Sequence, residues 1–379
     1  MNLELKNKII IVTGAAGIKG SIGETMIKHL VKEGSIPAII DRNDRGFEYV
    51  EEIKKSGIDA LFCKTDVTDP NQIKKSIKLI AAKYGRIDAI INNVGVNDGV
   101  GFDSSYNDFM NSLKLNMVSY FLVVKYALPY LKVFRITGGE PTMSKDTWKV
   151  LDYLLENPQY KIDIAINSNL GVPDVLIDKL IKKLNQLPEV GINVDIYTSI
   201  ESTGEQAEYA RDGLNYKQWL DNVNKVLELT KSKVAIMTTI NILSLPTFTD
   251  FIKTLMDLRA KHNTSFEYNR VPLSVNYLRW PPHLQCSLLD TKERVKYAND
   301  IETICNSWLK YNSPEKFARL YLEEWDQIKR FCEYLKTQTN AVEHRKDFVK
   351  FISEYDKRRS KDFYITFKDY ENLMETWSA

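Results

Sequence analysis

Short apolar runs alternate with amphipathic segments along the first third of the chain, up to about residue 132. The apolar runs have the length of strands, and the segments between them repeat apolar residues at helical spacing. This rhythm predicts βαβ units, in which helices cover both faces of a parallel sheet. The predicted strands are residues 8–13, 36–41, 60–64 and 87–92, and the predicted helices are residues 21–33, 45–55, 71–84 and 105–131.

The same rhythm continues after residue 132, where a predicted helix runs into a predicted strand without a Pro-, Gly- or Ser-rich linker. Beyond residue 288 the strand pattern fades and only helical spacing follows. The expected fold class is α/β with parallel strands, followed by a helical C-terminal region. The predicted strands are residues 133–137, 162–167, 193–199 and 234–241, and the predicted helices are residues 144–156, 175–187, 216–230, 248–261, 289–309, 314–337 and 343–357.

The segment VTGAAGIKGSIG follows the first predicted strand and opens the first predicted helix. Glycines at such a turn let backbone N–H groups approach a pyrophosphate at the helix N-terminus. We choose a register in which Ile27 and Leu30 face the sheet, because a motif that ended at Gly20 would turn Glu24 toward it. The predicted ligand-binding positions of the turn are Gly14, Ser21, Ile22 and Gly23.

Polar residues also follow the other predicted strands. Asp41 ends the second strand, where a carboxylate accepts hydrogen bonds from an adenosine ribose. This carboxylate would repel a 2′-phosphate and favours NAD over NADP, although the adjacent Arg42 weakens that preference. Because the carboxyl ends of parallel strands share the edge at which such sheets bind ligands, we predict a nucleotide site there. The other predicted positions at this edge are Asp66, Val67, Asn92 and Gly95.

Together with Asn116 in the fourth predicted helix, these positions give residues 1–132 a resemblance to the short-chain dehydrogenase/reductase family. The Gly-rich loop is longer than the family's usual turn, with Ser21 in place of the second glycine. EGSIP at residues 33–37 and NNVGVNDGVGFD at residues 92–103 resemble sugar dehydrogenases of the L-fucose type. The resemblance implies a truncated Rossmann domain, NAD as cofactor and an oxidoreductase ancestry in which an aldose is oxidised at C1 to a lactone.

The same resemblance implies a catalytic Ser on a fifth strand and a Tyr-x-x-x-Lys helix, in which Tyr transfers a proton. The one Tyr-x-x-x-Lys in this sequence is Tyr364 with Lys368, far outside the resembling segment. Because no fifth strand with a catalytic Ser precedes it, we interpret Tyr364 as a core aromatic. Asn116 is then the catalytic position that remains of an active site that is not completed.

A second resemblance begins at residues 134–144, FRITGGEPTMS, where a strand is followed by two glycines, an acid, a proline and a helix. Residues 133–379 resemble radical-SAM proteins of the twitch-domain branch. This resemblance implies a partial β/α barrel that continues the Rossmann-like sheet, and contacts to S-adenosylmethionine (SAM). The positions that match contacts to its amino group are Gly138, Gly139, Glu140 and Pro141. The positions that match contacts to its ribose and carboxylate are Ser168, Asn169, Ser199 and Arg211.

The cysteines do not fit radical-SAM chemistry. That family holds a [4Fe–4S] cluster with three cysteines spaced CxxxCxxC, and this sequence has no such segment. His283 and Cys286 have metal-like spacing but no second pair accompanies them. We expect no iron–sulfur cluster and no metal site, and interpret the cysteines as buried apolar groups. They are Cys63, Cys286, Cys305 and Cys332.

These observations predict three regions: a truncated Rossmann domain at residues 1–132, a partial radical-SAM barrel at residues 133–288 and a helical region at residues 289–379. Each of the two fragments ends at an open sheet edge, and exposed edges favour pairing. We therefore expect strand 133–137 to lie beside strand 87–92 in one long parallel sheet, with a separate half-barrel as the alternative.

Charge and hydropathy limit the partners. The chain has 52 basic and 50 acidic residues, which gives no reason to expect nucleic acid or an anionic membrane. No apolar run approaches the roughly 20 residues that span a bilayer, and the N-terminus lacks a signal-peptide pattern. We expect a cytoplasmic protein with small-molecule ligands; the oligomeric state does not follow from the sequence.

Three functional hypotheses remain open. The chain is an enzyme of one parent class, a nucleotide- or SAM-binding protein without catalysis, or a chimera without selected function that arose by deletion, recombination or misassembly of sequence data.

Overall fold

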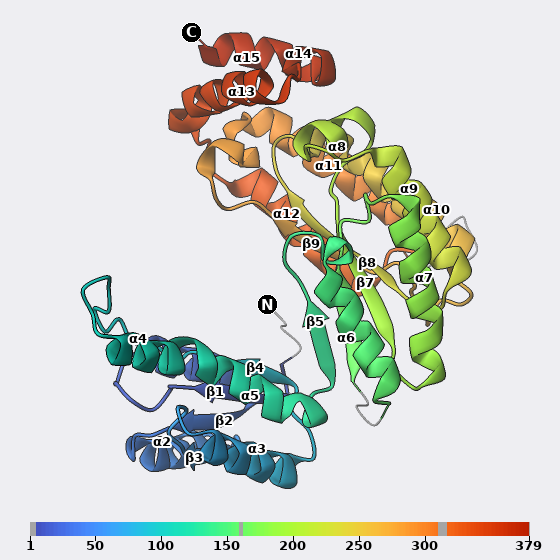
Figure 1. The fold of residues 1–379 in the computed structure, drawn as a ribbon. Helices are drawn as coiled ribbons and strands as arrows, with labels where there is room; N and C mark the ends of the chain where they lie inside the picture. Colours follow the sequence, from blue (N-terminus) through green and yellow to red (C-terminus); the bar gives the residue numbers. More distant parts are fainter. Residues whose placement is uncertain (1–4, 159–161, 310–316, 379) are drawn as a thin grey trace. The chain divides into compact units, whose positions relative to one another are not determined.

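The computed structural model describes residues 5–158, 162–309 and 317–378, and the chain divides into two compact units. The first unit comprises residues 1–134 with 159–163, and the second comprises residues 135–158 with 164–379. Each unit contains one sheet, and helices pack against both sheets (Figure 1). The predicted α/β class with a helical C-terminal region is confirmed.

The sheet of the first unit has the strand order β3-β2-β1-β4, and every pairing in it is parallel. The central strand β1 is apolar and fully buried, as expected for a parallel strand with helices on both faces. Strand order reverses between β1 and β4, which makes this point the topological switch of the sheet. The strands are β1 (Ile9–Thr13), β2 (Ile36–Asp41), β3 (Leu61–Lys64) and β4 (Ala89–Ile91).

Two apolar cores lie on the two faces of this sheet. One core contains buried side chains of α1 and α2, and the other contains buried side chains of α3 and α5. The predicted helix 105–131 is confirmed as one helical segment over residues 106–130, and it contains a π-helical turn, η1, between α4 and α5. The elements are α1 (Ile22–Lys32), α2 (Arg45–Lys55), α3 (Pro70–Tyr84), α4 (Tyr106–Leu113), η1 (Lys114–Val118), α5 (Ser119–Ala127) and η2 (Leu128–Tyr130).

The sheet of the second unit has the sequential order β5-β6-β7-β8-β9. The register from β6 to β9 is parallel, so each βα unit adds its strand on the same side of the sheet. This is the winding of a β/α barrel, but the strand order within the described ranges is open and does not close on itself. The strands are β5 (Val133–Ile136), β6 (Asp163–Asn167), β7 (Val194–Ser199), β8 (Val234–Ile240) and β9 (Leu273–Tyr277).

Helices connect the strands of the second unit and continue beyond its last strand. They bury apolar faces whose members include Trp148, Leu180, Trp219 and Phe251. The connecting elements are η3 (Pro141–Met143), α6 (Lys145–Glu156), α7 (Asp174–Glu189), α8 (Gly204–Ala210), α9 (Tyr216–Leu229), η4 (Leu245–Thr247) and α10 (Phe248–His262). The elements beyond β9 are η5 (Pro282–Leu284), η6 (Cys286–Leu288), α11 (Thr291–Ser307), α12 (Leu322–Thr337), η7 (Val342–His344), α13 (Arg345–Arg359), α14 (Phe363–Thr366), η8 (Lys368–Tyr370) and α15 (Glu371–Ser378).

The predicted single long sheet is wrong. Strand β5 pairs with β6 in the second sheet, and within the described residues the partner of β4 in the first sheet is β1. The seam, at residues 132 and 133, is the point where the two predicted fragments meet. The first sheet extends toward it only by an isolated parallel bridge between Ile87 and Leu131. The backbone of Ile87 donates to Tyr130 O over 2.9 Å and accepts from Lys132 N over 3.3 Å. Pairing with the β4 side therefore stops before β5 begins, and β5 takes its partner from the next βα unit.

Strand β9 was not among the predicted strands. Its sequence LSVNY alternates, with Leu273 and Val275 buried and Asn276 exposed, and it follows a proline. That alternation is typical of a strand with one face less buried than the other, and β7 (VDIYTS) shows it too.

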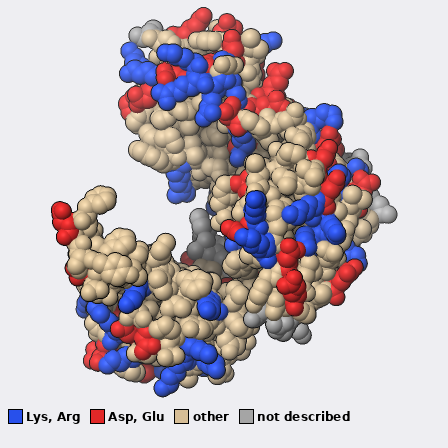
Figure 2. Space-filling model, viewed as in Figure 1, with Lys and Arg blue, Asp and Glu red and all other residues tan. Residues whose placement is uncertain are grey.

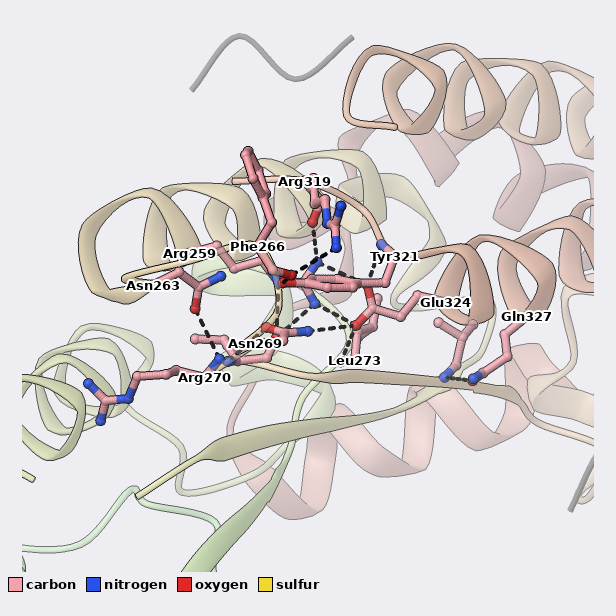
Figure 3. Close-up of polar contacts among 12 residues, drawn as sticks. Arg259, Asn263, Phe266, Asn269, Arg270, Leu273, Arg319, Tyr321, Glu324 and Gln327 are labelled. Atoms are coloured by element: carbon pink, nitrogen blue, oxygen red, sulfur yellow. Dashed lines mark hydrogen bonds and ion pairs between the residues drawn. The ribbon is translucent and has the colours of Figure 1, made fainter. Parts of the chain in front are cut away.

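The outer edge of β9 is covered by side chains of α12 (Figure 3). Glu324 Oε1 accepts from Leu273 N over 2.9 Å, and Gln327 Oε1 accepts from Val275 N over 2.7 Å. Exposed strand edges pair readily with other chains unless they are covered. A helix thus satisfies the donors that a further strand would otherwise bind.

Glu324 is itself held by Arg259, whose side chain is completely buried. The guanidinium donates to both carboxylate oxygens, over 2.6 and 2.9 Å, and to the carbonyl oxygens of Val271 and Arg319 (Figure 3). Such a fork satisfies the donors of a buried arginine. The ion pair links α10 to α12 at the edge of the sheet.

Surface properties agree with the composition. On the face drawn in Figure 2, Lys and Arg side chains are interspersed with Asp and Glu. In the parts of the chain that the structure describes, no helix is long and apolar enough to cross a membrane.

We predict that Glu324→Ala lowers the free energy of unfolding of the second unit by about 3–5 kcal/mol, because it leaves Arg259 buried without its anion. Denaturant unfolding followed by tryptophan fluorescence measures the change. Asp250→Ala is the matched control, since its partner Lys253 and Asp250 itself are both exposed, and it should cost less than about 1 kcal/mol. Equal losses for the two variants would contradict the assigned role of Glu324.

Candidate functional site

A cavity of about 480 Å³ lies at the carboxyl ends of the strands of the first sheet. It contains eight of the nine nucleotide positions predicted for this unit: Gly14, Ser21, Ile22, Gly23, Asp41, Asp66, Val67 and Gly95. The ninth, Asn92, does not line the cavity, whereas its neighbour Asn93 does. Parallel sheets bind ligands at this edge, beside the switch point, so the cavity is where nucleotide chemistry is expected.

At two positions of the Gly-rich loop, the backbone lies so close to the loop after β4 that a side chain would not fit. Gly14 has φ +69°, and a Cβ there would lie 2.7 Å from Val94 Cγ2. A Cβ at Gly23 would lie 2.6 Å from Asn93 Nδ2 and 2.7 Å from Gly14 O. Gly23 therefore permits close packing of α1 against the strand ends, as glycine does in dinucleotide-binding turns.

Helix α1 begins in the predicted register. Ser21 is its N-cap and accepts from Glu24 N over 3.3 Å, while Ile27 and Leu30 are buried against the sheet. Glu24 is also buried, with only 2% of its surface exposed, which the register did not predict. The helix therefore buries a carboxylate beside its apolar face.

The carboxylate of Glu24 lies among cations behind the Gly-rich loop. It accepts from Lys28 Nζ over 2.7 Å, from Arg45 Nη2 over 2.5 Å and from Gly20 N over 3.1 Å. The hydrogen bond from Lys28, with those from Arg45 and Gly20, outweighs burial and lowers the pKa of Glu24 to about 2. Glu24 is therefore ionised at neutral pH.

Asp41 is buried at the end of β2, and its carboxylate accepts hydrogen bonds from the backbone of two segments. Its Oδ2 accepts from Ala16 N over 2.8 Å and its Oδ1 accepts from Asn43 N over 3.0 Å. Each carboxylate oxygen has two acceptor positions, so two remain for a ribose. Asp66 has a similar local role, because its Oδ1 accepts from the backbone and hydroxyl of Thr68 over 2.8 and 2.7 Å.

Asn93 lines the cavity although it was not among the predicted site positions. Its Nδ2 donates to Thr13 O over 3.1 Å and to Gly14 O over 3.0 Å. Thr13 Oγ1 in turn accepts from Asn93 N and Val94 N. These bonds join the ends of β1 and β4. Asn92 Oδ1, by contrast, is buried without a hydrogen-bond partner in the described structure. Two adjacent asparagines in the sequence could have indicated that Asn92 and Asn93 have different roles.

Asn116 lies in the π-helical turn η1 and reaches the β4 loop. Its Oδ1 accepts from Val96 N over 2.9 Å, and its Nδ2 donates to Ser112 Oγ over 3.1 Å. The hydroxyl of Tyr120 donates to Val94 O nearby. π-Helical turns often occur at functional sites, and this one presents Asn116 to the loop that lines the cavity.

The interpretation of Tyr364 as a core aromatic is wrong. Its relative exposure is 45%, whereas Phe363 and Phe367 of the same short segment are buried. Residues at i and i+4 share one face of a helix, so the two phenylalanines occupy the core and Tyr364 points away from it.

In the second unit, Glu140 accepts hydrogen bonds from two of the other residues that were predicted to contact SAM. Its Oε1 accepts from Ser168 Oγ over 2.8 Å and from Thr142 Oγ1 over 2.7 Å, and its Oε2 accepts from Asn169 N over 2.8 Å. Thr142 N also donates to Oε1. The turn before it contains Gly138 with φ +110°, followed by Gly139, and Pro141 begins η3. The structure thus brings Glu140, Ser168 and Asn169 together.

Arg211 is already paired. It donates to Glu201 Oε2 over 2.6 Å, and Glu201, which follows β7, is only 4% exposed. Among the residues that the structure describes, Arg211 Nε is buried without a hydrogen-bond partner, and Ser199 lies exposed at the end of β7. Glu201 was not among the predicted positions, although its place just beyond a strand end was a usable signal.

The cysteines are buried in separate elements. Burial raises the pKa of Cys63 to about 11 and that of both Cys286 and Cys332 to about 12, and it also raises the pKa of Cys305. Their interpretation as buried apolar groups is confirmed. Among the described residues, no group of three or more His, Cys, Asp or Glu side chains could hold a metal ion.

Two family models match the chain. Residues 8–140 match the short chain dehydrogenase family, and residues 117–258 match the Radical SAM superfamily. The two matches overlap around the seam at residues 132 and 133. These matches confirm the two resemblances expected from the sequence over the residues that they cover, and the second match ends at residue 258.

Three proteins that are similar to the first segment are named as oxidoreductases or dehydrogenases. An uncharacterized oxidoreductase of Listeria innocua, Lin0452, is 38% identical over 95 residues, covering 25% of this chain and 37% of that protein. The 7alpha-hydroxysteroid dehydrogenase of Escherichia coli is 28% identical over 132 residues, covering 35% and 51%. The L-fucose dehydrogenase of Oryctolagus cuniculus is 27% identical over 127 residues, covering 33% and 43%. The chain therefore spans about half of the length of these relatives or less.

We predict that Gly23→Ala destabilises the first unit by about 1–3 kcal/mol, because the added methyl collides with Asn93 and with the backbone of Gly14. Thermal unfolding followed by circular dichroism measures the loss. Gly101→Ala, where a Cβ meets nothing within 4 Å, is the control and should leave the midpoint unchanged. If both variants unfold like the wild type, α1 does not depend on this close approach.

Proposed function

We propose that the first unit binds NAD through its adenosine diphosphate part, and that the chain completes neither the dehydrogenase nor the radical-SAM reaction. In this proposal it is a fusion of two fragments that retains binding without catalysis. The observation that carries the proposal is the cavity in which the Gly-rich loop, the N-terminus of α1 and Asp41 converge.

The chemistry of the cavity supports an adenine dinucleotide. The positive end of α1 and the loop backbone suit a pyrophosphate, and Asp41 retains acceptor positions for the ribose hydroxyls. Asp66 and Val67 line the adjoining wall. The charge of Asp41 disfavours a 2′-phosphate, so NAD is preferred, while Arg42 in the same lining reduces the difference from NADP.

Hydride transfer needs more than the cofactor. Residues 1–132 contain Asn116 but no Tyr-x-x-x-Lys, and losing a positioned acid or base typically costs about 10²–10⁴-fold in rate. The segment also covers only about half of its relatives, which supports binding of the adenosine half rather than turnover. Aldose oxidation, the ancestral chemistry inferred for this segment, is accordingly not proposed as its present activity.

One observation favours a weaker second ligand, SAM. Glu140 is anchored by four hydrogen bonds from neutral donors, and no Lys or Arg ion pair with it occurs in the described part of the chain. Its negative charge suits an ammonium group such as that of SAM. Because the sequence has no CxxxCxxC segment, we propose binding at most, without cleavage of SAM.

We expect NAD and ADP to raise the melting temperature of the purified protein. Ligand at 100 times Kd would contribute about 2.7 kcal/mol, and Asp41→Ala should remove the effect. Asp44→Ala, which removes an exposed carboxylate paired with Lys64, is the control. No NADH should form with L-fucose or other aldoses. NADH formation that depends on an aldose and is lost in Asp41→Ala would overturn the absence of catalysis.

Anaerobic reconstitution with iron and sulfide should give no stoichiometric [4Fe–4S] absorbance. Cluster ligands are thiolates, and burial disfavours the thiolate of each cysteine in this chain. Iron analysis and visible absorbance provide the measurement. About four irons per chain, lost when one cysteine is replaced by serine, would contradict the prediction.

A further inference from the structure

Two side chains that do not line the cavity form hydrogen bonds with the backbone of the Gly-rich loop. Arg45 Nη1 donates to Ala16 O over 3.4 Å, and Glu24 Oε2 accepts from Gly20 N over 3.1 Å. Arg45 and Glu24 are joined by their own 2.5 Å ion pair. Together they hold both ends of the segment 16–20.

We propose that Glu24 and Arg45 are positioning residues of the nucleotide site, whose ion pair holds residues 16–20 in the shape that receives a pyrophosphate. The inference rests on the proposed nucleotide binding and extends it to two residues outside the cavity. Neither residue was among the predicted site positions.

The loop needs such support because of its composition. It is glycine-rich and longer than the usual turn of its family, and a flexible backbone loses conformational entropy when it becomes ordered. A loop that is ordered before the ligand arrives avoids that cost during binding. The carboxylate of Glu24 is only 3% exposed, so its charge-assisted bonds are little weakened by solvent.

The negative charge of Glu24 makes it possible to distinguish a role in positioning the loop from a direct electrostatic effect on the ligand. Glu24 is negative, so by itself it repels the phosphates of a nucleotide. Its removal leaves Arg45 and Lys28 as uncompensated cations behind the loop. An electrostatic role alone therefore predicts tighter ADP binding by Glu24→Ala, whereas a positioning role predicts weaker binding.

Additional contacts keep the arrangement in place. Tyr49 OH donates to Glu24 O over 3.2 Å, and the Arg45 guanidinium lies 5.4 Å from the centre of the Tyr49 ring. Asn43 Nδ2 donates to Gly17 O over 3.4 Å. Arg45, Tyr49 and Asn43 all come from α2 or the turn before it, so the second βα unit holds the loop of the first.

The test measures Kd for ADP and for adenosine by ligand-observed NMR titration of the full chain. Glu24→Ala and Arg45→Met should weaken ADP binding about tenfold or more, the equivalent of one charged hydrogen bond. Adenosine, which lacks the pyrophosphate, should bind the variants as it binds the wild type. Glu51→Ala, which removes an exposed carboxylate of α2, is the matched control. Unchanged or tighter ADP binding by Glu24→Ala overturns the inference.

A second measurement keeps this inference separate from the proposed function. Hydrogen exchange of a peptide spanning residues 14–23 in the ligand-free protein should become faster in Glu24→Ala and Arg45→Met, and remain unchanged in Glu51→Ala. If the wild type binds neither ADP nor NAD, the proposed function fails, and the exchange rates still decide whether the pair orders the loop. Equal exchange in all four proteins would show that it does not.

Discussion

Backbone N–H groups at the ends and edges of the two parallel sheets lack a strand partner, and both units depend on carboxylates to accept from them. Asp88 accepts from Ile9 N where β1 begins, and Asp41 accepts from Ala16 N beyond the end of the same strand. Glu324 accepts from Leu273 N along the edge of β9, and Glu140 accepts from Asn169 N after β6. Because an unpaired buried N–H is costly, these acids fix the places where each ladder stops.

This use of carboxylates bears directly on how the candidate sites are interpreted. Asp41 and Glu140 are the acids expected to meet NAD and SAM, and each also accepts a hydrogen bond from the backbone of a neighbouring segment. Their presence in the sequence is therefore explained by folding as well as by binding. What distinguishes the two sites is what surrounds the acid. Around Asp41 a cavity with a helix N-terminus is formed, while Glu140 is surrounded by hydrogen bonds from its own turn and from the end of β6.

The parts of the structure that could be predicted are those determined by local sequence. Continuous apolar runs such as that of β1 marked the strands, and Ser21 with Ile27 gave the register of α1 correctly. The remaining features depend on residues distant in the sequence. Glu24 is buried and paired with Arg45, which comes from the next βα unit, and the partner of β5 is set by the unit that follows it. Strand β9 is short, has only two buried apolar residues and was not predicted, and its place is fixed by pairing with β8 and by side chains of α12.

The seam can exist without a linker because its backbone groups are satisfied in place. Lys132 N donates to Ile87 O over 3.3 Å, and Lys132 O accepts from Asp163 N over 2.8 Å. The bridge between Ile87 and Leu131 ends the ladder of the first sheet, and β5 begins two residues later. A join at this point leaves neither polar group of Lys132 unpaired, so two fragments of different ancestry can follow one another here without the desolvation cost of an unsatisfied backbone.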